Sequence, residues 1–120
     1  MRKLWIVLLL LVCSLVLFAS VKRVETLENV SDFAVTPKII EEYASISFTC
    51  NTGVHLTIEI LNFEGKLVTT ITSRVFLPGD YNLQWDRNDS SGSNLESGEY
   101  VIQVKEDKRF VTKRKTLILK

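Results

Sequence analysis

The stretch that decides the fold is Trp85-Asp86-Arg87-Asn88-Asp89-Ser90-Ser91-Gly92-Ser93-Asn94-Leu95-Glu96-Ser97-Gly98-Glu99-Tyr100. It contains the end of a predicted strand, a polar loop with two glycines, and an aromatic residue that opens the next strand. Trp85 and Tyr100 can pack their large rings at the end of a β-sandwich, on either side of the loop. Asp86 can accept hydrogen bonds from loop N–H groups, and Gly92 and Gly98 permit the turns. We interpret the stretch as architectural, with a ligand-binding loop as the alternative.

The residues on both sides of this stretch alternate between apolar and polar, which is typical of β-strands with one buried face. The clearest strands are 44–50 and 54–60, where the apolar residues occupy the even positions. All five glycines fall between predicted strands and none inside one. We therefore expect residues 32–120 to form an all-β, antiparallel sandwich of the immunoglobulin or fibronectin kind, with about seven or eight strands. The other expected strands are 33–36, 67–71, 74–77, 81–85, 100–105 and 110–119.

Three motifs are similar to those of a known family. The first is the hairpin Ile58–Val68, in which Gly65 precedes a lysine, and the second is Pro78–Asp86, which ends in Trp-Asp. The third combines Gly92 with the segment Ser97–Tyr100. Together they resemble the immunoglobulin-like domain of the bacterial flagellar hook-capping protein (FlgD). The resemblance covers residues 33–120 and implies fold-motif roles for Gly65, Trp85, Asp86, Gly92, Gly98 and Tyr100.

The same pattern resembles the C-terminal sorting domains of type IX secretion cargo, whose last strand is similar to Lys113–Lys120. Two departures from these families stand out. The residue after Trp-Asp is usually glycine and is Arg87 here, and the Pro-Asn-Pro common near the first strand of sorting domains is replaced by Pro37-Lys38-Ile39. No hook-cap N-terminal region or cargo domain precedes the module in this sequence, so we expect the module alone, exported behind its own signal.

Residues 1–20 are typical of a secretory signal peptide or a signal anchor. Arg2 and Lys3 precede an uncharged apolar run at 4–19, which is the pattern of an export signal. The run is short for a bilayer core, which takes about 20 residues. Cleavage of the signal and membrane anchoring through the uncleaved run both remain open. Either predicts an exported protein, periplasmic, secreted or at the cell surface, with 21–31 as a spacer.

Charge and reactive residues exclude several function classes. The formal net charge of +1 argues against nucleic acid as a partner, because such binding depends on neutralising phosphates. Cys50 is the only cysteine after the export segment, and we expect a buried small hydrophobe, with pairing between chains as the alternative. His55, the only histidine, is expected on the solvent face, where it cannot activate Cys50. We therefore expect no enzyme, no cofactor and no small-molecule substrate.

Calcium is the best metal candidate in the sequence. Asp86, Asn88 and Ser90 have the 1-3-5 spacing of oxygen ligands in a calcium loop. The sixth position is Ser91 rather than glycine, and the twelfth is Ser97 rather than glutamate. A calcium-dependent ligand-binding accessory module is therefore only a remote alternative, and we expect no metal site.

Two surfaces are candidates for contacts. Basic residues predominate in Lys105–Lys120, which we interpret as a charged edge strand that resists edge-to-edge pairing. The alternative is a contact surface centred on Lys113, Arg114 and Lys115 that binds a polyanion; Ser90–Glu96 is the second candidate surface. The first hypothesis is a non-enzymatic module for protein–protein binding or assembly at the bacterial cell envelope. The second is a C-terminal signal for secretion sorting or surface anchoring.

Overall fold

The computed structural model describes residues 28–120, so the expected signal or anchor at 1–20 and most of the expected spacer lie outside the described residues. All the regular structure within 28–120 is β-strand, in two sheets. No helix in this part of the chain has the length and hydropathy that a membrane crossing needs. The eight strands are β1 (Val30–Thr36), β2 (Ile39–Ile40), β3 (Ala44–Cys50), β4 (Val54–Asn62), β5 (Leu67–Phe76), β6 (Gly79–Trp85), β7 (Gly98–Glu106) and β8 (Phe110–Leu119).

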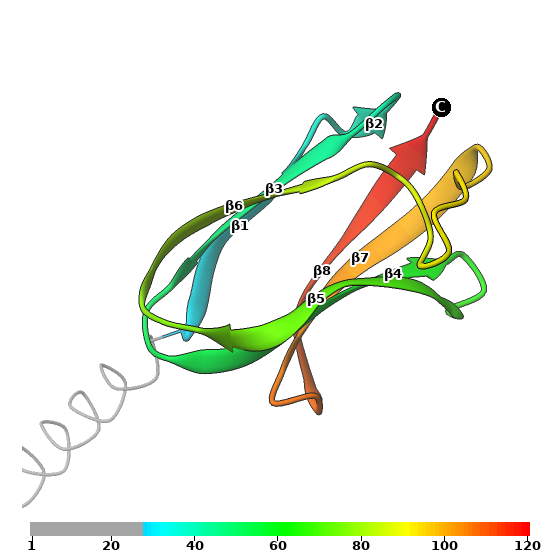
Figure 1. Cartoon of the computed structure of the whole chain (residues 1–120). Helices are drawn as coiled ribbons and strands as arrows, with labels where there is room; N and C mark the ends of the chain where they lie inside the picture. Colours follow the sequence, from blue (N-terminus) through cyan, green and yellow to red (C-terminus); the bar gives the residue numbers. More distant parts are fainter. Residues whose placement is uncertain (1–27) are drawn as a thin grey trace, which may run out of the picture.

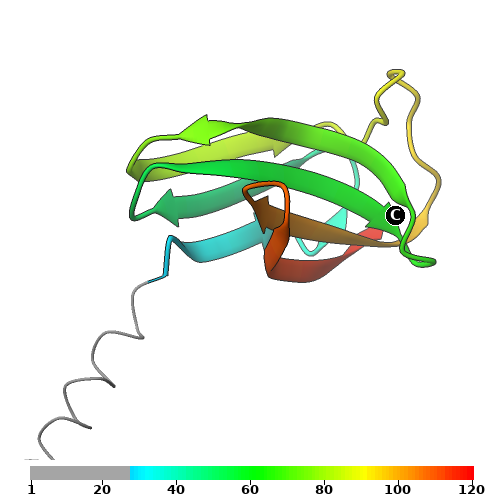
Figure 2. The ribbon, with the colours of Figure 1, turned by 90° about the horizontal axis from the view of Figure 1, so that it is seen from below.

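The two sheets form two layers, as Figure 1 shows. One sheet has three strands in the order β1-β3-β6, and the other has five in the order β2-β8-β7-β4-β5. Strands β5 and β6 therefore lie at the edges of different sheets, as do β1 and β2. Figure 2 shows the loop after β6 projecting at the end opposite to the one where β1 begins.

One pairing differs from the expected antiparallel pattern, because β2 pairs in parallel with β8. The pairs are Ile39 with Ile118 and Ile40 with Leu119. The chain changes sheets between β1 and β2, at a cis peptide bond before Pro37. In Figure 1, β2 continues in the general direction of β1, so it lies alongside the last strand without reversing. This two-residue strand was not foreseen in the sequence.

A single core lies between the sheets. The even-numbered apolar residues of β3 and β4 are all buried, as their alternation predicts. The inner residues of β7 and β8, such as Ile102 and Leu117, are buried in the same core and belong to the same sheet as β4. Burial of this apolar area is the main contribution to the stability of the fold. The core comprises Val30, Phe33, Ile40, Ala44, Ile46, Phe48, Cys50, Val54, Leu56, Ile58, Ile60, Phe76, Trp85, Ile102, Val104, Leu117 and Leu119.

Two strands differ in extent from the sequence-based expectation. Strand β1 begins at Val30, whose side chain is 2% exposed and belongs to the core, although residue 30 was expected in the spacer. Strand β5 is continuous, where separate strands at 67–71 and 74–77 were expected. The β4–β5 register shifts between Ile58 and Glu59, and such a bulge interrupts the apolar–polar alternation that marks a strand in the sequence.

The outer face of the five-stranded sheet carries a polar network. Gln103 donates to Glu59 Oε1 over 3.0 Å, and Arg114 donates to Gln103 Oε1 over 2.9 Å. Lys105 Nζ lies 2.9 Å from the same Glu59 oxygen. Neighbouring side chains bury Glu59 and Gln103 although both face away from the core. We call Glu59, Gln103, Lys105 and Arg114 the outer-face network.

Candidate functional site

The loop at 86–97, between β6 and β7, is held together by the carboxylate of Asp89. Its Oδ1 accepts from Ser91 Oγ at 2.7 Å, from Ser91 N at 2.9 Å and from Ser93 N at 3.0 Å. The hydrogen bond from the Ser91 hydroxyl, followed by that from the Ser93 N–H, lowers the pKa of Asp89 below its usual value. Asp89 N also donates to Ser93 O over 2.8 Å, so the middle of the loop is a closed turn.

Trp85 and Asp86 contact the first residues of this loop. The indole Nε1 of Trp85 donates to Asn88 O over 3.1 Å, and the ring is buried. Asp86 accepts from Asn88 N through Oδ1 and from Asn88 Nδ2 through Oδ2, at 3.2 and 3.1 Å. Gly92 has φ of 86°, a left-handed conformation that favours glycine. These contacts support the architectural interpretation of the stretch.

Tyr100 closes the other end of the loop. Its hydroxyl donates to Glu96 O over 2.9 Å, four residues back in the chain. At the opposite end of the molecule, Tyr81 repeats this arrangement by donating to Leu77 O over 2.7 Å. The glycine two residues before each tyrosine has positive φ, 151° at Gly98 and 152° before Tyr81. The Gly-acidic-Tyr sequence is therefore the same turn-closing device in two places.

Arg87 is the residue at this end that sequence reasoning missed, although its replacement of the usual glycine was the available signal. Its φ is 57°, so the backbone keeps a left-handed conformation that glycine adopts without strain. The side chain is only 6% exposed and extends back under the loop. Its Nη1 and Nη2 donate to the main-chain oxygens of Ile40 (3.3 Å), Glu41 (2.8 Å), Lys120 (2.9 Å) and Leu95 (3.0 Å).

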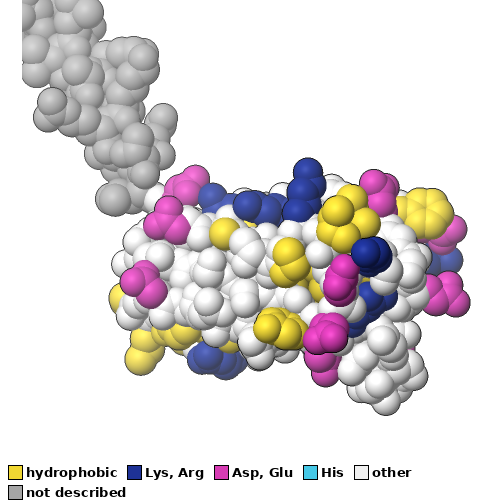
Figure 3. Space-filling view, turned by 90° about the horizontal axis from the view of Figure 1, so that it is seen from above, with side chains coloured by type: hydrophobic (Ala, Val, Ile, Leu, Met, Phe, Trp, Pro, Cys, Tyr) yellow, Lys and Arg dark blue, Asp and Glu magenta, His cyan; other side chains and the backbone are white. Residues whose placement is uncertain are grey.

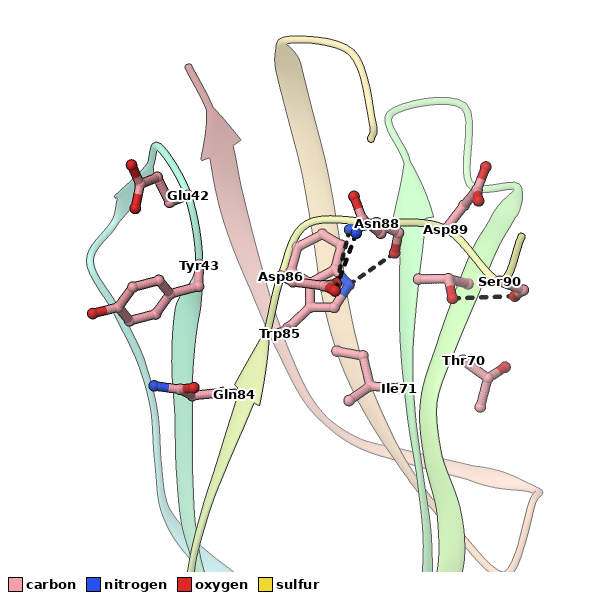
Figure 4. Close-up of a pocket in the computed structure, with 11 residues that line it drawn as sticks. Glu42, Tyr43, Thr70, Ile71, Gln84, Trp85, Asp86, Asn88, Asp89 and Ser90 are labelled. Atoms are coloured by element: carbon pink, nitrogen blue, oxygen red, sulfur yellow. Dashed lines mark hydrogen bonds between the residues drawn. The ribbon is translucent and has the colours of Figure 1, made fainter. Parts of the chain in front are cut away.

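A hollow of about 580 Å³ lies beside the loop, between the edge strands β5 and β6. Figure 4 shows Tyr43 and Gln84 on one side of it and Thr70 and Ile71 on the other. No motif in the sequence pointed to this hollow, because its walls come from segments far apart in the chain. The lining residues are Glu42, Tyr43, Thr69, Thr70, Ile71, Gln84, Trp85, Asp86, Asn88, Asp89 and Ser90.

The side chains of Asp86, Asn88 and Ser90, which have calcium-like spacing, make hydrogen bonds within the protein. Asn88 holds both carboxylate oxygens of Asp86, and the Ser90 hydroxyl lies 3.2 Å from Thr69 Oγ1. Figure 4 shows these contacts leading in different directions rather than towards one point. Within residues 28–120, no group of three or more His, Cys, Asp or Glu side chains has an arrangement that could hold a metal.

The candidate contact residues Lys113, Arg114 and Lys115 do not form one patch. Lys113 Nζ pairs with Glu28 Oε2 at 3.0 Å, and Lys115 Nζ lies 5.7 Å from the centre of the Phe33 ring. These two lysines therefore face the β1 side, whereas Arg114 joins the outer-face network on the opposite side of β8. The other candidate surface, Ser90–Glu96, lies in the loop, and Leu95 is half-buried there.

Cys50 belongs to the core, whereas His55 alternates with the buried residues Val54 and Leu56 and lies on the outer face of β4, as their positions in the strands predict. Cys50 is buried in the core, and burial raises the pKa of its thiol; Glu106 adds to the rise and Arg74 opposes it. The expectation of a fully solvated His55 is wrong in part. The residue is half-buried, and its Nδ1 is shielded from solvent with no hydrogen-bond partner among the described residues. The buried thiol is poorly placed to react.

Comparisons with known proteins agree with this geometry. The model of the FlgD Ig-like domain family matches residues 37–109, and none of the curated proteins matches the chain. Among solved structures, the chain is similar to part of dimeric latent PorU from Porphyromonas gingivalis: the TM-score is 0.64 and the identity 16%, over 78% of this chain and 10% of PorU. It is also similar to part of the alkylpurine DNA glycosylase AlkC of Pseudomonas fluorescens, solved bound to DNA containing an abasic site analog. There the TM-score is 0.52 and the identity 16%, over 77% of this chain and 30% of AlkC.

At this identity, the likeness to PorU and AlkC shows the fold alone, and the chain spans less than a third of either protein. The family match is more informative because it contains every fold-motif residue from Gly65 to Tyr100. It confirms the resemblance drawn from the sequence motifs. Since the matched segment is more than half of the sequence, the chain belongs to the FlgD Ig-like domain family.

Proposed function

We propose that this protein is an exported, non-enzymatic β module that binds another protein at the bacterial cell envelope. The observation that carries the proposal is the edge strand β5 of the five-stranded sheet, which among the described residues pairs only with β4. An uncovered strand edge presents unpaired N–H and C=O groups to which an extended segment of a partner can add. Leu67 and Val75 on this strand are 56% and 58% exposed, which supplies apolar contact area along the edge.

A second open edge lies at the other side of the same sheet. Strand β2 pairs only with Ile118 and Leu119, so among the described residues no strand pairs with β8 on that side from Phe110 to Thr116. Phe110 and Val111 are 60% and 45% exposed there. Family membership and the export pattern at 1–20 support the envelope as the location.

The binding proposal is tested by photo-crosslinking in the cells that make the protein. A photoreactive amino acid is placed at Val75 on β5 or at Val111 on β8. The control position is Phe63, which is 79% exposed in the turn between β4 and β5 and belongs to neither edge strand. We expect discrete crosslinked products from the edge positions and none from Phe63. Products from Phe63 alone, or from no position, would contradict binding through the edges.

The location is tested by determining the N-terminal residue and the membrane partitioning of the same chain. A mature protein that begins near Ser20 and is released by osmotic shock would be a free periplasmic or secreted module. An intact Met1 in the membrane fraction would be an anchored one. Retention in the cytoplasm would contradict both forms of the proposal.

Secretion sorting is the second candidate function, and the exposure of the first half of β8 favours it. The exposed strand could be read by secretion machinery in the way that the resemblance to type IX sorting domains implies. The test is to fuse residues 28–120 to an exported reporter in a host with that machinery. Surface display of the reporter would support sorting, and periplasmic retention would remove it.

A further inference from the structure

We infer that the partner includes a second copy of this chain, and that copies pair head to tail through two complementary flanks. The acidic flank is the hollow between β5 and β6, and the basic flank lies between β1 and β8 on the opposite side. This inference rests on the proposed function and deepens it by naming a partner. Its basis is the charge and the open backbone of the two flanks.

The acidic flank carries three acidic side chains and no basic one. Glu42, Asp86 and Asp89 line its hollow of about 580 Å³. Hydrogen bonds lower the pKa of Asp89, so its carboxylate stays ionised in neutral solution. The hollow adjoins Thr70 and Ile71 on β5, which pairs with β4 on one side and with no described strand on the other. Negative charge therefore lies directly beside the open side of an edge strand.

The basic flank has the opposite charge. Its hollow of about 370 Å³ lies between β1 and β8, and Lys38 and Lys115 line it with no acidic residue. Figure 3 shows Lys and Arg side chains in a row along one long edge of the molecule. The neighbouring hollow along β8 is mixed, because there Lys113 is paired with Glu28. The lysines of this flank that make no ion pair with a described residue, Lys38 and Lys115, therefore lie around Thr116.

The backbone of β8 is open at the basic flank. Ile118 N donates to Lys38 O and Lys120 N to Ile40 O, so these amides point towards β2. Alternate residues of a strand point their N–H and C=O groups to the same side. Thr116 therefore presents its backbone groups to the side of β2, at a level before β2 begins, and no described strand pairs with them.

The order of the strands sets the direction of the pairing. From β5 through β4 and β7 to β8, every neighbouring pair is antiparallel. Strands β5 and β8 of one sheet therefore run in opposite directions. A second copy displaced sideways without rotation brings its β8 against β5 of the first in the antiparallel sense, so the sheet continues across the boundary.

Charge favours this head-to-tail pairing over a two-fold dimer. An isologous dimer would place each flank against its own copy, acid on acid or base on base, and like charges at an interface are costly. A heterologous contact joins opposite charges and leaves one free flank of each kind at the ends. The assembly is therefore open and can add further copies.

The test uses the full chain in detergent extracts of the producing cells, with the charge of one flank changed at a time. The basic flank is reversed by Lys38→Glu with Lys115→Glu, and the acidic flank is neutralised by Glu42→Lys with Thr70→Lys, because the two lysines balance Asp86 and Asp89. All four side chains are exposed, and none makes a hydrogen bond or ion pair with a described residue. Chemical crosslinking measures the distribution of oligomers, and circular dichroism checks that each variant is folded.

We expect a ladder of oligomers from the unaltered chain and a loss of self-association on the order of tenfold or more for each variant alone. A mixture of the two variants should give dimers and nothing longer, because only one complementary pair of flanks remains. Raising the salt concentration should weaken the ladder. A monomeric unaltered chain, or variants that assemble as well as it does, would overturn the inference.

A disulfide test does not depend on the charge variants. Leu67→Cys and Thr116→Cys, which the strand pairings place at the same level of the sheet, are combined in a Cys13→Ser background, which leaves the buried Cys50 as the only other thiol. We expect oxidation to link copies covalently, and the matched pair Val75→Cys with Thr116→Cys, whose positions lie far apart along the strands, to stay monomeric. Equal linkage in both pairs would overturn the inference. If copies do not link but Val75 crosslinks to another protein in cells, this inference fails and the proposed function stands; if neither occurs, both fail.

Discussion

The two ends of the molecule both combine an arginine with large aromatic rings, but one arginine packs on a ring at the surface and the other is a buried hydrogen-bond donor. At the end where β5 leads into β6, Phe48, Phe76 and Tyr81 pack together with ring centroids 4.8–5.4 Å apart. Arg74 lies over the Phe76 ring at 3.8 Å and is exposed. This end is held by packing of rings, and its arginine covers the outside of the packed group.

At the other end, Arg87 is buried and three separate segments of the chain contact its side chain. Its guanidinium holds main-chain oxygens of the β2 region, the last described residue and the loop at 86–97. Segments that turn irregularly leave carbonyl oxygens without strand partners, and a planar guanidinium can supply donors to several of them at once. The comparison shows that packed aromatic rings can stabilise an end of the sandwich where the turns are tight. An end with irregular segments needs a buried hydrogen-bond donor for their carbonyl oxygens.

The largest expected effect is at the aromatic end. Phe76 is fully buried and touches both Phe48 and Tyr81, so Phe76→Ala should cost about 3–5 kcal/mol of the free energy of unfolding. Urea denaturation measures the loss. Phe63→Ala is the control, because Phe63 is 79% exposed and its truncation should change little. Equal losses for the two variants would contradict a ring-packed end.

The next effect separates the two arginines. Arg87→Ala removes the guanidinium donor from the part-buried main-chain oxygens of Glu41, Leu95 and Lys120 and should cost about 2–4 kcal/mol. Arg74→Ala removes an exposed ring contact and should cost about 1 kcal/mol or less. Urea denaturation of both variants tests the comparison directly, and a larger loss from Arg74→Ala would reverse it.

Arg87→Gly sharpens this result, because it separates the side chain from the backbone. Glycine adopts the positive φ of residue 87 without the strain that alanine carries, a difference of about 1 kcal/mol. Arg87→Gly should therefore be less destabilising than Arg87→Ala by that amount. If the two variants unfold at the same urea concentration, the left-handed backbone at this position contributes nothing.

The matched tyrosines provide a smaller test. Tyr81→Phe and Tyr100→Phe each remove one hydroxyl that donates to a carbonyl four residues back, and each should cost about 1 kcal/mol. The two losses should be similar, because the turn-closing device is the same at both ends. Thermal unfolding measures them, and a loss from only one variant would show that the two turns are not equivalent.

Much of the fold could be predicted because a strand with one buried face has a local signature. Alternation at 44–50 and 54–60 correctly placed the core residues of β3 and β4, since a period of two depends only on neighbours in the chain. The parallel strand β2 could not be found this way. It has two residues, and its partner Ile118 lies almost eighty positions away.

The candidate site was predicted less well, for the same physical reason. Arg87 bonds to Glu41, 46 positions away, and no local pattern reports such an acceptor. The hollow between β5 and β6 likewise joins Glu42 to the loop. Lys113, Arg114 and Lys115 were grouped into one surface because they are neighbours in sequence. They lie in a strand, where successive side chains point to opposite faces, so Arg114 is separated from the two lysines.

The smallest expected effect is confined to the loop at 86–97 and depends on pH. Because the folded loop lowers the pKa of Asp89, the ionised carboxylate stabilises the loop above the unfolded pKa, and this contribution is lost as the pH falls through the lower, folded pKa. In acid, the amide protons of Ser91 and Ser93 should therefore lose protection relative to their intrinsic exchange rates, while those of the core strands keep theirs. NMR-detected hydrogen exchange measures both. Asp89→Asn keeps an oxygen acceptor without the charge, so its loop should exchange at a rate that does not depend on this titration. A variant that still shows the acid transition would assign it to another carboxylate, and the irregular end would then depend on Arg87 rather than on its anionic turn.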